Sequence, residues 1–209
     1  MSGRTAGHPM SDDLTIDREL ASAALGAAAK LHEAQRGEAL EPAVRAAALV
    51  ARALASGHKV LVFGNGGSAA EAQHFAAELA GRFVLERRAL PADALTTDTS
   101  ILTAVGNDYG FDRVFSRQIE ALGQPGDVAF GISTSGHSAN VIEALRAARA
   151  GGLATVALTG RDGGEMAREA DEHVNVAAST TARIQEVQLT LIHVICEIVE
   201  RRLFQTDRT

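Results

Sequence analysis

An apolar run that ends in a cluster of glycines constrains the fold of this chain more than any other feature. Residues 59–63 read Lys-Val-Leu-Val-Phe, residues 64–68 read Gly-Asn-Gly-Gly-Ser, and an alanine-rich segment follows. β-Branched and aromatic residues favour a strand, glycines permit a tight turn, and alanine favours a helix. The stretch therefore predicts a strand, a glycine turn and a helix over 68–80. Backbone amides at such a turn can bind an anion.

Strand and helix patterns continue to alternate along the chain. Further strands are predicted at 92–95, 127–132, 153–158 and 173–176. Further helices are predicted at 99–105, 112–121, 138–150 and 183–203, with a short helix after the glycine loop 160–164. Strands separated by helices pair in parallel, with both faces of the sheet covered. We expect an α/β fold with a five-stranded parallel sheet.

Two predicted helices precede the first strand. The first spans 12–35 with Asp12 or Asp13 as its cap, and the second runs from Pro42 to Gly57. Small and apolar side chains form one stripe of the first helix, namely Leu20, Ala24, Ala27 and Leu31. This stripe packs either against other subunits, which is the favoured interpretation, or over the sheet of its own chain.

The composition is typical of one globular domain, and its low aromatic content suggests a polar ligand. Of the 209 residues, 46% are hydrophobic, 22% are charged and only 4% are aromatic. We expect a flexible leader over 1–11 and a single domain over 12–209, with its core at about 57–203. The net charge of −6 argues against a nucleic-acid surface and a polybasic membrane patch.

The location predicted for the protein is the cytoplasm. The first ten residues lack the apolar core of a signal peptide, and no apolar run reaches the roughly 18 residues of a membrane span. A single cysteine excludes a disulfide framework and fits a reducing compartment.

A second loop, Ser-Thr-Ser-Gly-His-Ser at 133–138, follows a predicted strand and precedes a predicted helix. Hydroxyls and the first amides of a helix satisfy phosphate oxygens, and the helix dipole adds to the attraction. For any one serine the alternative is a simple N-cap. Four hydroxyls within six residues favour a phosphate site made of Ser133, Thr134, Ser135 and Ser138.

Nucleotide-binding and hydrolase motifs are not met. Gly64-x-Gly66-x-x-Ala69 matches a loose dinucleotide fingerprint, but that fold needs an acidic residue about 20 positions further on. The one candidate, Asp98, lies too far along the chain. The Walker pattern fails because the chain has no Gly-Lys dipeptide, and no GxSxG nucleophile elbow is present.

Two helices carry residues suited to metal binding or acid–base chemistry. His74 and Glu78 stand four residues apart and share a helix face. Gln185 and His193 on the last helix are about 12 Å apart along its axis and about 80° apart around it. One regular helix therefore does not bring both to one ion. Either Gln185 reaches back from the helix start, or different subunits supply the two. Alone on an apolar helix, His193 would be a core histidine.

Five segments together resemble the sugar isomerase (SIS) domain family, over roughly 12–203 and in matching order. They read GNGGSAAEAQHFAAEL, GNDYGFDRVFSRQIEALGQPGDV, GISTSGHSANVIEAL, ALTGRDGG and RIQEVQLTLIH. The resemblance implies a three-layer αβα sandwich and a homotetramer with sites between subunits. It also implies an aldose–ketose isomerase that interconverts sedoheptulose 7-phosphate and D-glycero-D-manno-heptose 7-phosphate. The glycine turn would then let the backbone approach the sugar.

The resemblance also implies the roles of individual residues. It gives one Zn²⁺ per subunit, with the ligands His74, Glu78, Gln185 and His193. Glu78 and His193 are the implied acid–base pair. The implied substrate contacts are Asn65, Gly66, Gly67, Glu78, Asn107, Asp108, Ser133, Thr134, Ser135, Ser138 and Gln185. The chain departs from the family at Ala182, where an acidic residue is common, and at His137, where asparagine is usual.

The alternatives are binding proteins with the same fold. A replication-initiator-associating branch lacks the glutamate and the final histidine, whereas Glu78 and His193 are both present here. SIS regulators usually carry a DNA-binding domain, whereas some 58 residues precede the first strand here and they are acidic and alanine-rich. The residues therefore favour the enzyme.

Overall fold

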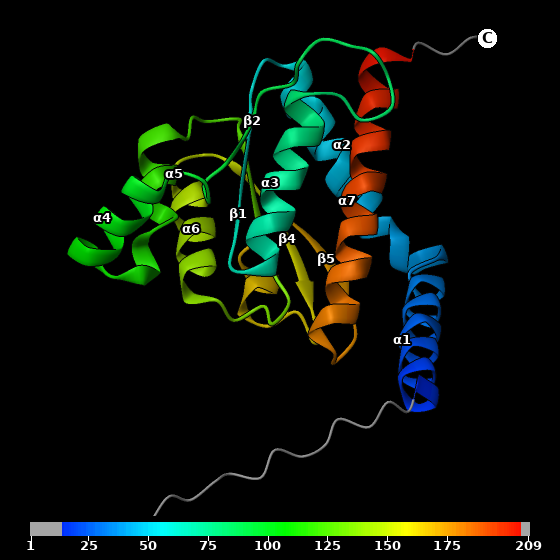
Figure 1. Ribbon diagram of the computed structural model, residues 1–209. Coiled ribbons are helices and arrows are strands. Elements are labelled where there is room, and N and C mark those ends of the chain that lie inside the picture. The colour runs from blue at the N-terminus through cyan, green and yellow to red at the C-terminus, as the bar shows by residue number, and fades with distance from the viewer. Residues whose placement is uncertain (1–13, 206–209) are drawn as a thin grey trace, which may run out of the picture.

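The computed structural model describes residues 14–205, and within this range a parallel sheet lies between two layers of helices (Figure 1). Five strands are ordered β2-β1-β3-β4-β5, and every neighbouring pair is parallel. The strands are β1 (Val60–Gly64), β2 (Ala92–Ala94), β3 (Val128–Ser133), β4 (Ala154–Gly160) and β5 (Glu172–Val176). The predicted α/β fold, a three-layer αβα sandwich with a five-stranded parallel sheet, is confirmed.

Each face of the sheet is covered by its own set of helices (Figure 1). One set comprises α2 (Glu41–Ala55), α3 (Gly67–Ala80) and α7 (Thr181–Phe204), and the other comprises α4 (Thr99–Tyr109), α5 (Ser116–Leu122) and α6 (Ala139–Ala150). Side chains alternate between the faces along a strand. In β1, Val60 and Val62 accordingly join the core under α2, α3 and α7, whereas Leu61 and Phe63 join the core under α5 and α6.

Within the described residues the structure has three short 3₁₀ helices, η1 (Gly37–Leu40), η2 (Phe111–Arg113) and η3 (Glu165–Arg168). Of these, η3 is the short helix predicted after the glycine loop 160–164, whereas η1 and η2 were not predicted as separate elements. The helix predicted over 99–105 continues to Tyr109 and ends at Gly110, whose φ of +87° suits glycine. Asp98 is the N-cap of this helix, where its Oδ1 accepts a hydrogen bond of 2.9 Å from the Ile101 N–H.

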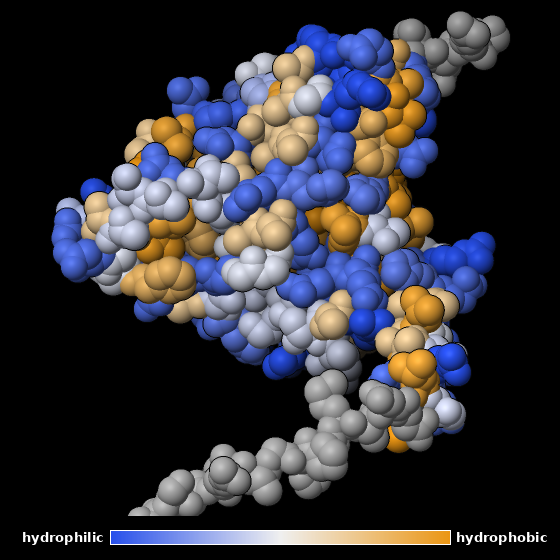
Figure 2. Space-filling model, in the orientation of Figure 1, coloured by the Kyte–Doolittle hydropathy of each residue, from blue (hydrophilic) through white to orange (hydrophobic). Residues whose placement is uncertain are grey.

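The first helix, α1 (Leu14–Ala34), extends away from the sandwich (Figure 1). None of its described residues is buried, and Figure 2 shows hydrophobic surface along it. Large apolar side chains are 54–72% exposed at Leu14, Ile16, Leu20 and Leu25. Leu31 alone of the predicted stripe packs against the core within the described chain. The predicted leader over 1–11 and the predicted caps at Asp12 and Asp13 lie outside the described residues.

Contacts near the C-terminal half of α1 attach it to α7. His32 Nε2 lies 2.9 Å from Thr190 Oγ1, and Arg183 donates a hydrogen bond of 2.7 Å to the Ala24 carbonyl. Across residues 14–205, no helix combines the length and the apolar character that a membrane span needs.

Candidate active site

A small cavity lies at the carboxyl ends of β1 and β3, where α/β sheets bind their ligands. Its volume is about 230 Å³. The residues that line it are Asn65, Gly67, Ser68, Ile132, Ser133, Thr134, Ser135, Ser138, Thr181 and Gln185. All four hydroxyl residues of the predicted phosphate loop are among them.

The hydroxyls of this loop converge on one another. Ser133 Oγ lies 2.9 Å from Ser138 Oγ and 3.3 Å from Ser135 Oγ. Ser138 is the N-cap residue of α6, yet within the described chain its side chain makes no capping hydrogen bond. The simple-cap alternative therefore does not account for Ser138. Clustered hydroxyls at the start of a 12-residue helix can donate to a phosphate group.

The glycines of the turn allow close contacts with other parts of the same chain. Gly66 has a φ of +57°, which favours glycine, and a Cβ at Gly67 would collide with the Nε2 atom of Gln185. The missing side chain at Gly67 thus makes room for Gln185. Asn65 and Asn140 exchange two amide hydrogen bonds of 2.8 Å, which tie the glycine turn to the first turn of α6.

His74 and Glu78 on α3 meet His193 on α7. His74 Nε2 lies 2.9 Å from His193 Nε2 and 3.3 Å from Glu78 Oε1. One ligand atom from each of the three residues can be chosen so that all lie within 4.8 Å of one another. His193 is therefore part of a polar cluster rather than a core histidine. Two imidazoles and a carboxylate form a donor set suited to zinc, so the residues fit a metal site.

Gln185 and His193 lie at different levels of the same helix. Both belong to the continuous helix α7, which lies beside α3 (Figure 1). Gln185 contacts Gly67 at the start of α3, whereas His193 meets His74 about two turns further along. This placement agrees with the spacing argument from the sequence.

Asn107 and Asp108 are not brought to this site within the described chain. Both are exposed on α4, and Asn107 Nδ2 donates a hydrogen bond of 2.7 Å to Asp108 Oδ1. Helix α4 belongs to the opposite layer and extends away from the sheet (Figure 1). Neither residue is among those that line the cavity.

Neither departure from the family pattern is among the residues that line this cavity. His137 lines a separate cavity with Asp162, Glu165 and Arg168. Ala182 is an exposed residue in the first turn of α7.

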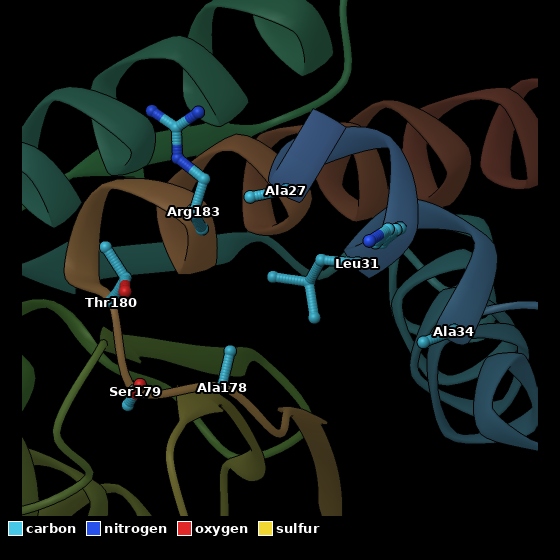
Figure 3. A pocket seen from close by; sticks show the side chains of 8 residues that line it. Ala27, Leu31, Ala34, Ala178, Ser179, Thr180 and Arg183 are labelled. Carbon is cyan, nitrogen blue, oxygen red and sulfur yellow. The ribbon is translucent and has the colours of Figure 1, made fainter. Parts of the chain in front are cut away.

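A larger cavity, of about 400 Å³, lies between α1 and the start of α7 (Figure 3). Ala27, Leu31, Ala34 and Ala178 provide much of its lining. The Arg183 guanidinium at its edge is already engaged by Glu186, at 2.7 Å. None of the predicted site residues lines this cavity, so we place the chemistry at the smaller one.

A buried carboxyl group on α3 is absent from the predicted set. Glu71 is 7% exposed, and neither of its carboxylate oxygens has a hydrogen-bond partner among the described residues. Burial raises the pKa of Glu71 to about 7, although the nearby Ser68 hydroxyl acts in the opposite direction. Gln188 on α7 is also buried, and its Oε1 atom has no hydrogen-bond partner in the described chain.

The similarity of the chain to known proteins extends over most of its length. A family model described as the SIS domain matches residues 25–160. A phosphoheptose isomerase from Geobacter sulfurreducens is 55% identical over 195 residues, which cover 93% of this chain and 100% of that protein. A phosphoheptose isomerase from Roseiflexus is 63% identical over 149 residues, covering 71% of this chain and 76% of that protein.

A solved structure agrees with these relatives. The phosphoheptose isomerase from Neisseria gonorrhoeae superposes with a TM-score of 0.83 at 49% identity, and the match covers 88% of this chain and 98% of that chain.

Proposed function

This chain belongs to the SIS domain family, and from that premise we propose that it is a phosphoheptose isomerase. It converts sedoheptulose 7-phosphate to D-glycero-D-manno-heptose 7-phosphate, the first step towards a nucleotide-activated heptose. The observation that carries the proposal is the meeting of Glu78 and His193 with His74, about two helical turns from a cavity lined by hydroxyls. The binding-protein alternative lacks the glutamate and the final histidine.

The substrate lies along the α3–α7 pair. Its phosphate accepts hydrogen bonds from Ser133, Thr134, Ser135 and Ser138, and Asn65, Gly66, Gly67 and Gln185 contact the sugar. The first residue of α3 and His74 are about 10 Å apart along the helix axis. An extended seven-carbon sugar phosphate has a comparable length. The reacting carbons at the opposite end from the phosphate therefore come to the level of Glu78.

The reaction moves a carbonyl from C2 to C1 through two proton transfers. The Glu78 carboxylate removes a proton from C1, which gives an enediol or enediolate, and returns a proton to C2. His193 moves a proton between the oxygens on C1 and C2. The C–H bond at C1 is broken and one at C2 is formed, so the sugar is isomerised with no external oxidant or reductant.

His74, Glu78 and His193 are the residues of one chain that would hold a zinc ion, with Gln185 of another subunit as the proposed fourth ligand. When bound, zinc would stabilise negative charge on the sugar oxygens and help to orient the sugar. The three-residue cluster supports this assignment because its donor atoms already face one another.

A homotetramer is proposed for two reasons. Helix α1 presents four large apolar side chains to solvent, which a bundle of subunits would cover. Asn107 and Asp108 lie on a different layer from the cavity, so their substrate contacts require a neighbouring subunit.

The cytoplasm is the proposed location. The one cysteine, Cys196, is a free and buried thiol, as suits a reducing compartment. Burial, reinforced by the negative charges of Glu78 and Glu200, raises the pKa of this thiol.

The test is incubation of the zinc-loaded protein with sedoheptulose 7-phosphate, followed by NMR. We expect the signals of an aldoheptose 7-phosphate to appear. Absence of product from a folded, zinc-loaded tetramer would refute the isomerase and favour the binding protein.

A further inference from the structure

The carboxylate of Glu200, near the end of α7, is held by the segment that follows α3. It accepts hydrogen bonds of 2.9–3.0 Å from three consecutive backbone N–H groups, those of Phe83, Val84 and Leu85. Burial alone would raise the pKa of Glu200, but these donors and Arg87 outweigh it and lower the pKa. The buried group is therefore a carboxylate bound in a nest of amides.

Arg87 links this carboxylate to the end of α3. Its Nε donates to Glu200 Oε1 at 2.9 Å, and both side chains are only 2% exposed. Its Nη2 donates to the Glu78 carbonyl at 2.8 Å, and its Nη1 to the Leu79 carbonyl at 2.8 Å. A cation at the C-terminus of a helix satisfies its last carbonyls and complements its dipole. Arg87 thereby fixes the helical turn that carries Glu78.

Phe83 connects the same segment to His193. The Phe83 and His193 rings have centroids 5.4 Å apart, and the His193 and His74 rings have centroids 5.1 Å apart. Phe83 itself is half-buried against the core. The His193 imidazole therefore lies between two rings, one of which is held in place through the Glu200 amide nest.

We infer that Glu200, Arg87 and Phe83 form a clamp that positions both members of the acid–base pair. The clamp fixes Glu78 through its backbone carbonyl and His193 through its ring. Glu200 and Arg87 lie behind the site and act through other residues, and Phe83 acts on the ring of His193. The inference rests on the proposed function, since it assigns these residues to the same site.

The test compares two substitutions of Phe83. Phe83→Leu keeps an apolar side chain but removes the ring, so His193 is free to turn. We expect kcat to fall about tenfold with KM for sedoheptulose 7-phosphate within about twofold, because misplacement affects the chemical step. Zinc affinity, measured by competition with a chelator, should also fall about tenfold, as for other residues that orient metal ligands. Phe83→Tyr, which keeps the ring, should restore both quantities to within about twofold.

Glu200→Gln and Glu86→Gln form a matched pair in the same region. The Glu86 side chain is 91% exposed, so its substitution should leave kcat and zinc affinity unchanged. Glu200→Gln removes the charge that holds Arg87 and Phe83. It should therefore lower kcat and zinc affinity as Phe83→Leu does. If it does not fold, which thermal unfolding and gel filtration will show, the Phe83 variants still decide the question.

The outcomes distinguish failure of the clamp proposal from failure of the proposed isomerase function. Unchanged kcat and zinc affinity in Phe83→Leu would overturn the clamp while the wild type still converts the sugar. A wild type that binds zinc but does not convert the sugar, with affinity reduced in Phe83→Leu, would overturn the isomerase and keep the clamp. A wild type with neither zinc binding nor activity would overturn both.

Discussion

Buried polar groups at the two ends of the α3–α7 helix pair differ in whether they have hydrogen-bond partners. At the C-terminal end, Glu200 accepts hydrogen bonds from three amides and from Arg87, which also donates to carbonyls of α3. Nearer the N-terminal end, both oxygens of Glu71 and the Oε1 atom of Gln188 have no partner among the described residues. Between them, His74, Glu78 and His193 direct donor atoms at one another.

We call the C-terminal end, with Glu200 and Arg87, the framework, and the cluster of His74, Glu78 and His193 the site. Buried polar groups with full sets of partners fix one geometry, whereas unpaired ones cost free energy in the free protein. The clustered ligand atoms of His74, Glu78 and His193 are therefore where an ion supplies missing interactions, whereas the unpaired oxygens of Glu71 and Gln188 cost stability. We expect substitutions at the site to remove catalysis, whereas substitutions at the framework should cost stability in addition to the smaller loss of activity expected for the clamp.

The largest effect is expected for Glu78→Gln. The amide cannot remove the C1 proton, so turnover should fall about a thousandfold or more while the oligomer stays intact. Product formation followed by NMR, together with gel filtration, measures both. The exposed Glu197 on α7 offers a control, since Glu197→Gln should retain full activity. Turnover that survives in Glu78→Gln would remove Glu78 as the base.

Removal of metal should have the next largest effect. A chelator should lower activity at least about tenfold, because charge on the sugar oxygens loses its stabilisation, and added zinc should restore it. His74→Ala, which removes one proposed ligand, should weaken recovery by zinc. Full activity in protein shown to be metal-free would contradict the ligand assignment.

The fold followed from local patterns that the structure preserves. The apolar runs at 127–132 and 153–158 became the buried strands β3 and β4, because a strand covered on both faces must be apolar throughout. The region after Asp98 was harder, since 112–121 divides into η2 and α5. The break falls at Val114 and Phe115, which are buried in the core under α5 and α6, and this burial depends on distant contacts that the local pattern does not specify.

Two parts of the candidate site are visible as local patterns in the sequence, but the residues that support it are not. Four hydroxyls in one loop and a histidine–glutamate pair on one helix face are visible in the sequence. Glu71 and Glu200 look like ordinary helical glutamates, because a glutamate has the same local pattern whether it faces solvent or a distant partner. Glu200 finds Arg87 at a sequence separation of 113 residues, which no local pattern specifies.

On stability, the larger effect should follow from Arg87→Met at the framework end. It leaves the Glu200 carboxylate buried without its cation and the Glu78 carbonyl without its donor. The free energy of unfolding in urea should fall by ~3–5 kcal/mol, as when one partner of a buried pair is lost. Arg36→Met is the control: it removes an exposed ion pair with Glu33, which contributes no more than ~1 kcal/mol. Equal losses of unfolding free energy in the two variants would show that the buried Arg87 pair contributes no more to stability than an exposed ion pair.

On stability, the smaller effect, and one of opposite sign, is expected at Glu71. Its pKa is about 7 in the folded protein against 4.5 ordinarily, so the folded state keeps a proton that the unfolded state releases. The stability of the wild type should therefore fall as pH rises from 4.5 through 7 and level off above. Glu71→Gln resembles the protonated form at every pH, so it should stabilise the protein by ~3 kcal/mol at pH 8 and by less than ~1 kcal/mol at pH 5. Urea unfolding across this range measures the difference, with Glu197→Gln, at an exposed position of α7, as the matched control. If the stabilities of the wild type and of Glu71→Gln change in parallel from pH 5 to pH 8, then Glu71 has hydrogen-bond partners in the folded protein. In that case the two ends of the α3–α7 pair would no longer differ in the pairing of their buried carboxyl groups, and only the Glu200 clamp would remain of the comparison.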